Sequence, residues 1–198
     1  NRWEAANRLA TQILLEIAEL VENEAETRID ERLFEAVGTN LRLALDDKKD
    51  GFYDKAMLAN MLTLPTEAYL IDASGVANVD AISRARLTLK RELAFRFEAE
   101  FYEIFRQNDF SGPYSPDGES VARRQLKNLA LQYLVSTDKS DAIDICIRQL
   151  ETAKNMTEES TSLRELVFSG SDRAMDSKES LLLAFYEKWK FESLVVDL

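Results

Sequence analysis

Acidic side chains are the most abundant groups in this sequence that could do chemistry. Glu16 and Glu19 are spaced to share a helix face, and so are Glu98 and Tyr102. Two carboxylates, or a carboxylate beside a phenol, can act as general acid and general base. However, 36 of the 198 residues are Asp or Glu, so such pairs arise from composition alone. We therefore interpret both pairs as parts of a solvated acidic surface.

Histidine is absent from the 198 residues. Its absence excludes, within this chain, an H-E-x-x-H zinc helix, a Ser-His-Asp or Cys-His couple and a Glu-x-x-His di-iron bundle. The single cysteine, Cys146, excludes an internal disulfide framework and a multi-thiolate zinc site. It lies near Ile143, Ile147 and Leu150 on one helical face, which predicts a buried thiol. The sequence therefore predicts no catalytic, metal-binding or cofactor-binding residue.

The stretch "DDKKDG" places Asp46, Asp50 and Gly51 at the spacing of a calcium-binding helix-loop-helix. Lys48 occupies a ligand position, and Met57 stands where a bidentate Glu is required. Such a site would lack most of its negative oxygens, so we predict a polar turn between two helices. The glycines also miss the spacing of phosphate-binding loops.

One stretch, "VARRQLKNLALQYL", carries clustered positive charge, with Arg123 and Lys127 on one helix face. The whole chain has a net charge of -11, which repels nucleic-acid backbones and anionic lipid. Binding of RNA would also need a broader basic surface and exposed aromatic platforms. We therefore predict no nucleic-acid partner and no membrane partner. Arg123 and Lys127 are interpreted as a solvated or interdomain helix face.

Apolar spacing and the scarcity of turn residues, 6 Gly and 3 Pro, predict an all-α fold. One long helix should begin near Asn78 or Asp80, with Ile82 to Ile104 in a single stripe. The expected helices are 2–22, 28–45, 53–62, a short one after Pro65, the long one, 120–135, 140–154, 157–168 and 176–190.

Short connections between helices that are apolar on one stripe predict antiparallel neighbours. The expected architecture is an irregular superhelical array of about eight or nine helices, similar to HEAT or armadillo solenoids. Residues 1–198 should form a single helical domain, with a loop break near residues 108–119. Trp3 and Trp189 lie on apolar stripes and are predicted to be buried. Helical spacing begins within the first residues, so we expect a piece of a longer polypeptide.

Five stretches in collinear order resemble the carboxy-terminal helical region of bacterial aminopeptidase N, a family of zinc-dependent alanyl aminopeptidases. They are "NRWEA", "LTLPTE", "ESVARRQLKNLALQYL", "ETAKNMTEES" and "LLLAFYEKWKFESLVVDL". The resemblance covers residues 1–198 and implies the first part of a helical superhelix that roofs the active site. The H-E-x-x-H motif, its distal glutamate and the G-A-M-E-N segment belong to other domains of that family, so no family site residue has a position here.

The resemblance implies a noncatalytic fragment of a cytoplasmic zinc aminopeptidase that removes amino-terminal residues from peptides. Zinc and peptide substrates would belong to the parent enzyme, and the partner of this chain would be the catalytic domain of the same polypeptide. The fragment itself is expected to be inactive and to limit substrate access by enclosure. Two alternatives stay open: a free-standing helical scaffold that binds a protein partner, and an independent carboxylate enzyme.

Overall fold

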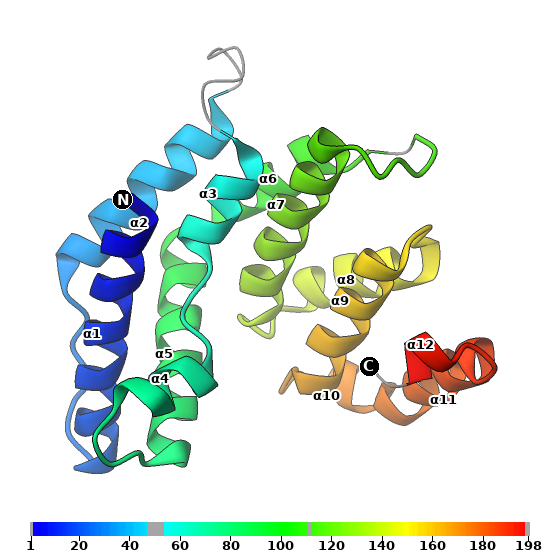
Figure 1. Cartoon of the computed structure of the whole chain (residues 1–198). Coiled ribbons are helices and arrows are strands. Elements are labelled where there is room, and N and C mark those ends of the chain that lie inside the picture. The colour runs from blue at the N-terminus through cyan, green and yellow to red at the C-terminus, as the bar shows by residue number, and fades with distance from the viewer. Residues whose placement is uncertain (1, 47–53, 111, 197–198) are drawn as a thin grey trace.

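The computed structural model describes residues 2–46, 54–110 and 112–196, and within these ranges the chain forms twelve helices and no strand (Figure 1). This confirms the all-α prediction. The helices are α1 (Arg2–Glu22), α2 (Glu31–Leu45), α3 (Lys55–Leu62), α4 (Glu67–Ala73), α5 (Val79–Arg96), α6 (Glu98–Asn108), α7 (Gly118–Val135), α8 (Ser140–Thr152), α9 (Met156–Phe168), α10 (Asp172–Met175), α11 (Lys178–Trp189) and α12 (Ser193–Val196).

Six helices begin after a polar residue whose side chain caps the first turn. The first N–H groups of a helix have no partner within it, and a side-chain oxygen at the preceding position can accept from one of them. Asn78 does so for α5 by accepting from the Ala81 N–H at 3.1 Å, as the sequence indicates. The other capping residues are Asp30, Asp54, Thr66, Asp117 and Asn155.

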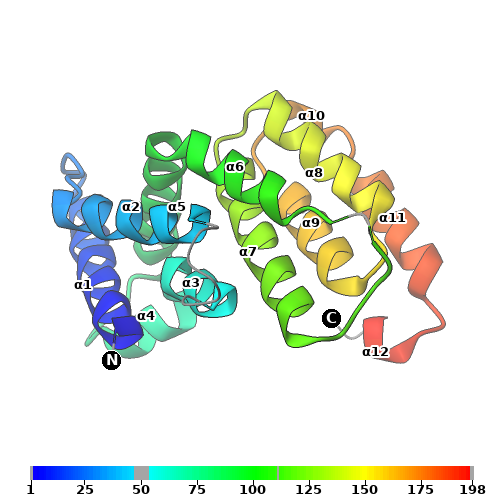
Figure 2. The same ribbon diagram turned by 90° about the horizontal axis from the view of Figure 1, so that it is seen from above.

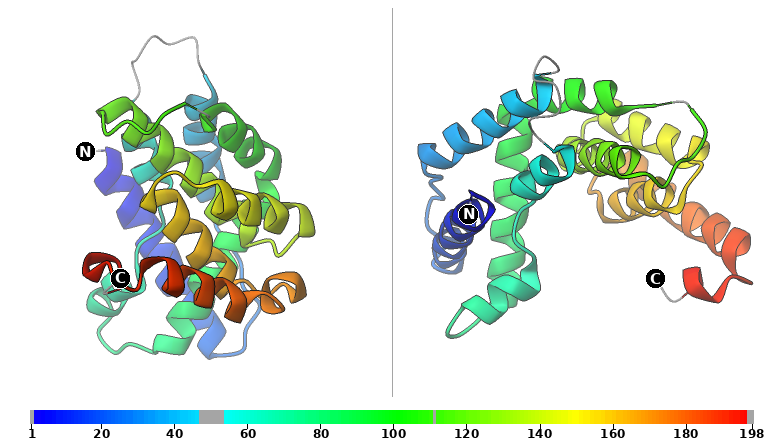
Figure 3. Two further views of the ribbon diagram at one scale, coloured as in Figure 1. Left: turned by 90° about the vertical axis from the view of Figure 1, so that its right-hand side faces the viewer. Right: turned by 45° about the horizontal axis from the view of Figure 1, so that its top comes forward.

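The helices stack side by side along a curved path from the amino-terminal to the carboxy-terminal end (Figure 2; Figure 3, right). In this path α1 packs on α5, both α3 and α6 pack on α7, and α8 packs on α9. The predicted superhelical array of helix pairs is confirmed. None of the helices in the described ranges is both long enough and apolar enough to span a membrane.

Helix α7 lies at the centre of the stack and is buried around most of its circumference. Leu126 and Leu134 belong to a core cluster shared with α1 to α6, whereas Leu131 and Val135 belong to a second cluster shared with α8, α9 and α10. The expectation that each helix is apolar on one stripe only is therefore wrong for α7. The physical reason is that α3, α5, α6, α8 and α9 all contact it.

The predicted long helix is divided into α5 and α6 at Phe97, so the prediction of one continuous helix is wrong. Phe97 has φ -120° and ψ 30°, although its N–H still donates to the Leu93 carbonyl. Its ring lies against Gly38 of α2, where an added Cβ would stand 3.1 Å from a ring carbon. The break turns the chain, so that α5 packs on α1 while α6 packs on α7. The apolar spacing continues across Phe97 and gave no sign of this turn.

The two ends of the described chain depart from the prediction in two further ways. The helix predicted over residues 176–190 is present as α11, but the short α10 before it is not predicted, and α11 has no buried residue. The burial predicted for the tryptophans is wrong for Trp3, which is 45% exposed. Trp189 is only partly buried, and its Nε1–H donates to Glu159 at 2.9 Å. Trp3 lies in the first turn of α1, and Trp189 lies at the end of α11, which packs on α9.

Candidate functional site

Cys146 is fully buried, as predicted, and it is not a candidate nucleophile. Its thiol lies 3.5 Å from the Ser162 carbonyl, between α8 and α9. Burial, together with the negative charge of Glu165, raises the pKa of the Cys146 thiol to about 12. The reactive thiolate is therefore scarcely populated near neutral pH.

The acidic pairs are not assembled as acid–base couples. Glu16 is exposed and accepts a hydrogen bond from Gln12 at 2.8 Å, which agrees with a solvated surface. Glu98 instead forms an ion pair with Lys139, whose Nζ lies 2.6 Å from Oε2. Burial and the neighbouring Asp141 raise the pKa of the Tyr102 hydroxyl, so it stays protonated.

The described residues contain no group of three His, Cys, Asp or Glu side chains placed to hold a metal ion. Lys48, Asp50 and Gly51, on which the calcium interpretation of "DDKKDG" depends, lie outside the described residues.

Of the two interpretations of the face that carries Arg123 and Lys127, solvated or interdomain, the structure contradicts the solvated one at Lys127. Lys127 is only 5% exposed, and its Nζ lies 2.7 Å from Glu158 Oε1 and 2.9 Å from Asp109 Oδ1. Arg123 pairs with Glu119 at 3.2 Å, but its Nε is buried without a hydrogen-bond partner among the described residues. The solvated interpretation is wrong for Lys127, because α9 and the loop between α6 and α7 cover this side of α7.

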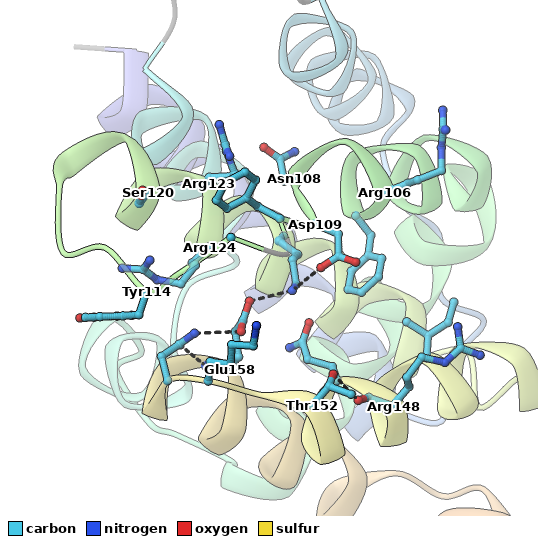
Figure 4. A pocket seen from close by; sticks show the side chains of 18 of the residues that line it. Arg106, Asn108, Asp109, Tyr114, Ser120, Arg123, Arg124, Arg148, Thr152 and Glu158 are labelled. Atoms are coloured by element: carbon cyan, nitrogen blue, oxygen red, sulfur yellow. Dashed lines mark hydrogen bonds and ion pairs between the residues drawn. The ribbon is translucent and has the colours of Figure 1, made fainter.

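Arg123 and Lys127 line a cavity of about 750 Å³, here called the α6–α9 cavity (Figure 4). Its walls come from α6, the loop between α6 and α7, α7, α8 and the beginning of α9. Six basic and three acidic side chains line it, although the whole chain is acidic. The basic ones are Arg106, Arg123, Arg124, Lys127, Arg148 and Lys154, and the acidic ones are Glu103, Asp109 and Glu158.

Gln149 of α8 supplies a buried acceptor to this cavity. Its side-chain Nε2 donates to Asn128 Oδ1 at 2.9 Å and to Ser162 Oγ at 3.0 Å, which fixes the orientation of the amide. The other amide atom, Oε1, is buried and has no partner among the described residues. Buried polar atoms are normally hydrogen-bonded, so this oxygen marks a position where a donor is missing.

Aromatic rings form much of the remaining wall. Lys127 Nζ lies 5.5 Å from the centre of the Phe105 ring, and the Arg124 guanidinium lies 4.9 Å from the centre of the Tyr114 ring. Arg124 also donates to the Ser115 carbonyl at 2.9 Å, which ties the loop to α7. The cavity thus combines positive charge, apolar surface and unpartnered polar atoms, a combination typical of ligand sites.

A second cavity of about 500 Å³ lies between α2 and α5, lined by residues that include Phe34, Thr88 and Arg96. Arg96 is held there by Glu31 at 3.0 Å and by the Phe34 ring, 4.7 Å from its guanidinium carbon. The Arg96 guanidinium is thus already paired. The two buried atoms without a hydrogen-bond partner described above, Arg123 Nε and Gln149 Oε1, belong to residues that do not line this second cavity. The α6–α9 cavity is therefore the better candidate.

Sequence reasoning missed this site because its residues come from four helices and a loop. Only the basic stretch around Arg123 gives a signal, and its pattern favours a solvated or interdomain helix face. Gln149 carries no motif, and its role depends on the approach of α8 to α7 and α9.

Comparison with known proteins shows similarity along the whole chain. Aminopeptidase N of Escherichia coli is 28% identical over 198 residues, and aminopeptidase N of Caulobacter vibrioides is 27% identical over 197 residues. In each case the match covers 100% of this chain and 21% of the relative. This chain therefore spans about a fifth of the length of these relatives. The sequence resemblance to aminopeptidase N is confirmed.

A similar fold occurs in a crystal structure of Legionella pneumophila aminopeptidase A in complex with aspartic acid, with a TM-score of 0.77 and 23% sequence identity. The match covers 99% of this chain and 22% of that chain. The model of a domain of unknown function with ARM repeats, DUF3458_C, matches residues 1–198. A stack of helices agrees with that description. The chain belongs to the DUF3458_C ARM-repeat family.

Proposed function

We propose that this chain is the noncatalytic, carboxy-terminal helical part of a cytoplasmic, zinc-dependent aminopeptidase. The observation that carries the proposal is similarity to aminopeptidase N over the whole chain, with a similar fold in aminopeptidase A. The described residues offer no His and no metal-binding cluster, so zinc and the water that it activates would be held elsewhere in the parent polypeptide.

The role of this part would be to enclose the active site and to limit access to peptides with free amino termini. A curved helical stack presents a long concave surface that can cover a neighbouring domain. The catalytic domain of the same polypeptide would be its partner, and peptides would be the substrates of the parent. Enclosure also keeps bulk water away from the reacting groups.

The test is to assay the 198-residue chain and the longer polypeptide that carries it, at equal concentration and with added zinc. We expect the longer polypeptide to hydrolyse an alanyl aryl-amide and to lose this activity to a chelator. The chain alone should show no turnover, because unassisted peptide hydrolysis is too slow to observe. Stoichiometric zinc and chelator-sensitive turnover in the chain alone would contradict the proposal.

A free-standing scaffold for protein binding is the second candidate, and one observation favours it. Helices α11 and α12 expose apolar side chains that a partner could cover, including Leu183 at 59% and Leu194 at 89%. The coding sequence before Asn1 separates the two candidates. An H-E-x-x-H motif followed by a distal glutamate supports the aminopeptidase, and an initiator methionine directly before Asn1 supports the scaffold.

A further inference from the structure

We propose that the α6–α9 cavity is a binding site for a small organic anion that carries an apolar group and a hydrogen-bond donor. This goes beyond the enclosing role, because it assigns a ligand site to the helical chain itself. The volume of about 750 Å³ lies within the range of roughly 300–1,000 Å³ that small-molecule sites occupy.

The requirement for an anion follows from charges that are not neutralised. Lys127 is paired with both Asp109 and Glu158, so these three residues satisfy one another. No carboxylate of the described residues lies within ion-pair distance of Arg148 or Lys154, and Arg124 is engaged only by a carbonyl and a ring. Figure 4 shows Arg124 beside Tyr114 at one end of the lining and Arg148 beside Thr152 at the other, with Glu158 between them. An anion that enters the cavity can therefore reach a guanidinium group that no carboxylate of the described residues neutralises.

The requirement for a donor follows from Gln149. Its amide is buried, with 6% exposed, and its orientation is fixed by bonds from Nε2 to Asn128 and Ser162. Oε1 can therefore only accept, and a ligand that fills the cavity must supply an N–H or O–H to it. The Nε–H of Arg123 has no partner among the described residues, and it can donate a hydrogen bond to an acceptor atom of the ligand. The two atoms together favour a ligand with an acidic head and a separate donor.

The requirement for an apolar group follows from the walls. Phe105 and Ile145 belong to the partly buried apolar side chains packed against the core, and both line the cavity. Inorganic phosphate alone would leave these surfaces in contact with water. A carboxylate or a phosphate ester with an aromatic or aliphatic body fills the volume and covers them.

A matched pair of probes tests the charge requirement. N-acetyl-phenylalanine is an anion at pH 7.5, whereas its amide has the same body and the same N–H donor without the charge. Titration calorimetry with this 198-residue chain should show one saturable site, with the anion bound at least about tenfold more tightly than the amide. Phenyl phosphate, measured in parallel, shows whether carboxylates or phosphate esters are preferred.

A matched pair of variants tests the location. Arg148→Gln removes an exposed cavity charge and should weaken binding of the anion by about fivefold to tenfold. Arg8→Gln makes the same change on α1, where the side chain is 80% exposed, and should leave binding unchanged. Gln149→Met should weaken binding of N-acetyl-phenylalanine but not of 3-phenylpropionate, which has no N–H. If Gln149→Met fails to fold, the Arg148→Gln comparison still decides the location.

Several results would overturn the proposal. These are no binding of any of the three anions at about 10 mM, equal binding of the anion and the amide, or an equal loss in Arg148→Gln and Arg8→Gln. Binding of a glutamate-rich peptide without binding of the small anions would also overturn it, because the cavity would then be a docking surface for polypeptide. None of these measurements uses aminopeptidase activity, so they do not depend on the proposed function.

Discussion

The Lys127 ammonium lies 2.7 Å from Glu158 Oε1 and links the middle of α7 to the first turn of α9. The side chains of both residues are largely buried, with 6% and 15% exposed. Both residues line the α6–α9 cavity, and they are 31 residues apart in the sequence.

Replacement of Lys127 by Met should lower the free energy of unfolding by about 2–4 kcal/mol, because it leaves the Glu158 carboxylate buried without its charged partner. Asp109→Asn should cost less than about 1 kcal/mol, since that carboxylate is 59% exposed. Urea unfolding followed by circular dichroism measures both values. Equal losses in the two variants would contradict the burial that the structure assigns to Glu158.

The Tyr133 hydroxyl should stabilise the contact between α7 and α3. It is buried and donates to the Leu62 carbonyl at 2.7 Å, where α3 ends. Tyr133→Phe removes the donor and should cost about 1–2 kcal/mol. Tyr69→Phe is the matched control, because Tyr69 is 49% exposed, and its effect on thermal or urea unfolding should be close to zero. A neutral Tyr133→Phe would show that the carbonyl finds another donor.

Helix α11 should open locally at a lower free energy than the rest of the stack. It has no buried residue, and its main anchors are Trp189 and Lys188, which both donate to Glu159. Hydrogen–deuterium exchange should therefore be much faster in α11 than in α7, whose side chains are buried on several faces. Equal protection of the two helices would contradict this prediction.

The Cys146 thiol should make stability fall at high pH. Its pKa is raised to about 12 in the folded chain, compared with roughly 8.5 for an unfolded thiol. As the pH rises, the unfolded state loses this proton before the folded state does. The contribution of the protonated thiol to the free energy of unfolding is therefore complete below roughly pH 8.5 and is lost as the pH rises toward 12. Between pH 8 and pH 10, the free energy of unfolding of the natural chain should fall by about 2 kcal/mol more than that of the Cys146→Ala variant.

Urea unfolding of both proteins at the two pH values measures this difference. Tyrosine and lysine titration affects both proteins alike, so subtraction isolates the thiol. Identical pH dependence would show that Cys146 is open to solvent. Slow reaction with a thiol reagent at pH 8, followed by complete reaction in urea, is the independent check.

Local sequence determined where six of the twelve described helices begin. Asp30, Asp54 and Asn78 each accept from the backbone in the first turn, and this preference depends only on neighbouring residues. The apolar face that includes Cys146 was likewise readable, because helical periodicity places residues on one side before any packing occurs. Composition sufficed for the helical class, since few glycines and prolines are available for turns.

Tertiary structure alone decided the break at Phe97, the burial of Lys127 and the cavity. At Phe97 the apolar spacing is uninterrupted, but α5 and α6 pack on different partners, so the chain must turn there. Lys127 follows a polar pattern typical of a helix surface, and its burial depends on Glu158 and Asp109 arriving from other elements. Burial and pairing are properties of residues far apart in the chain, and local spacing carries no information about which helices will meet.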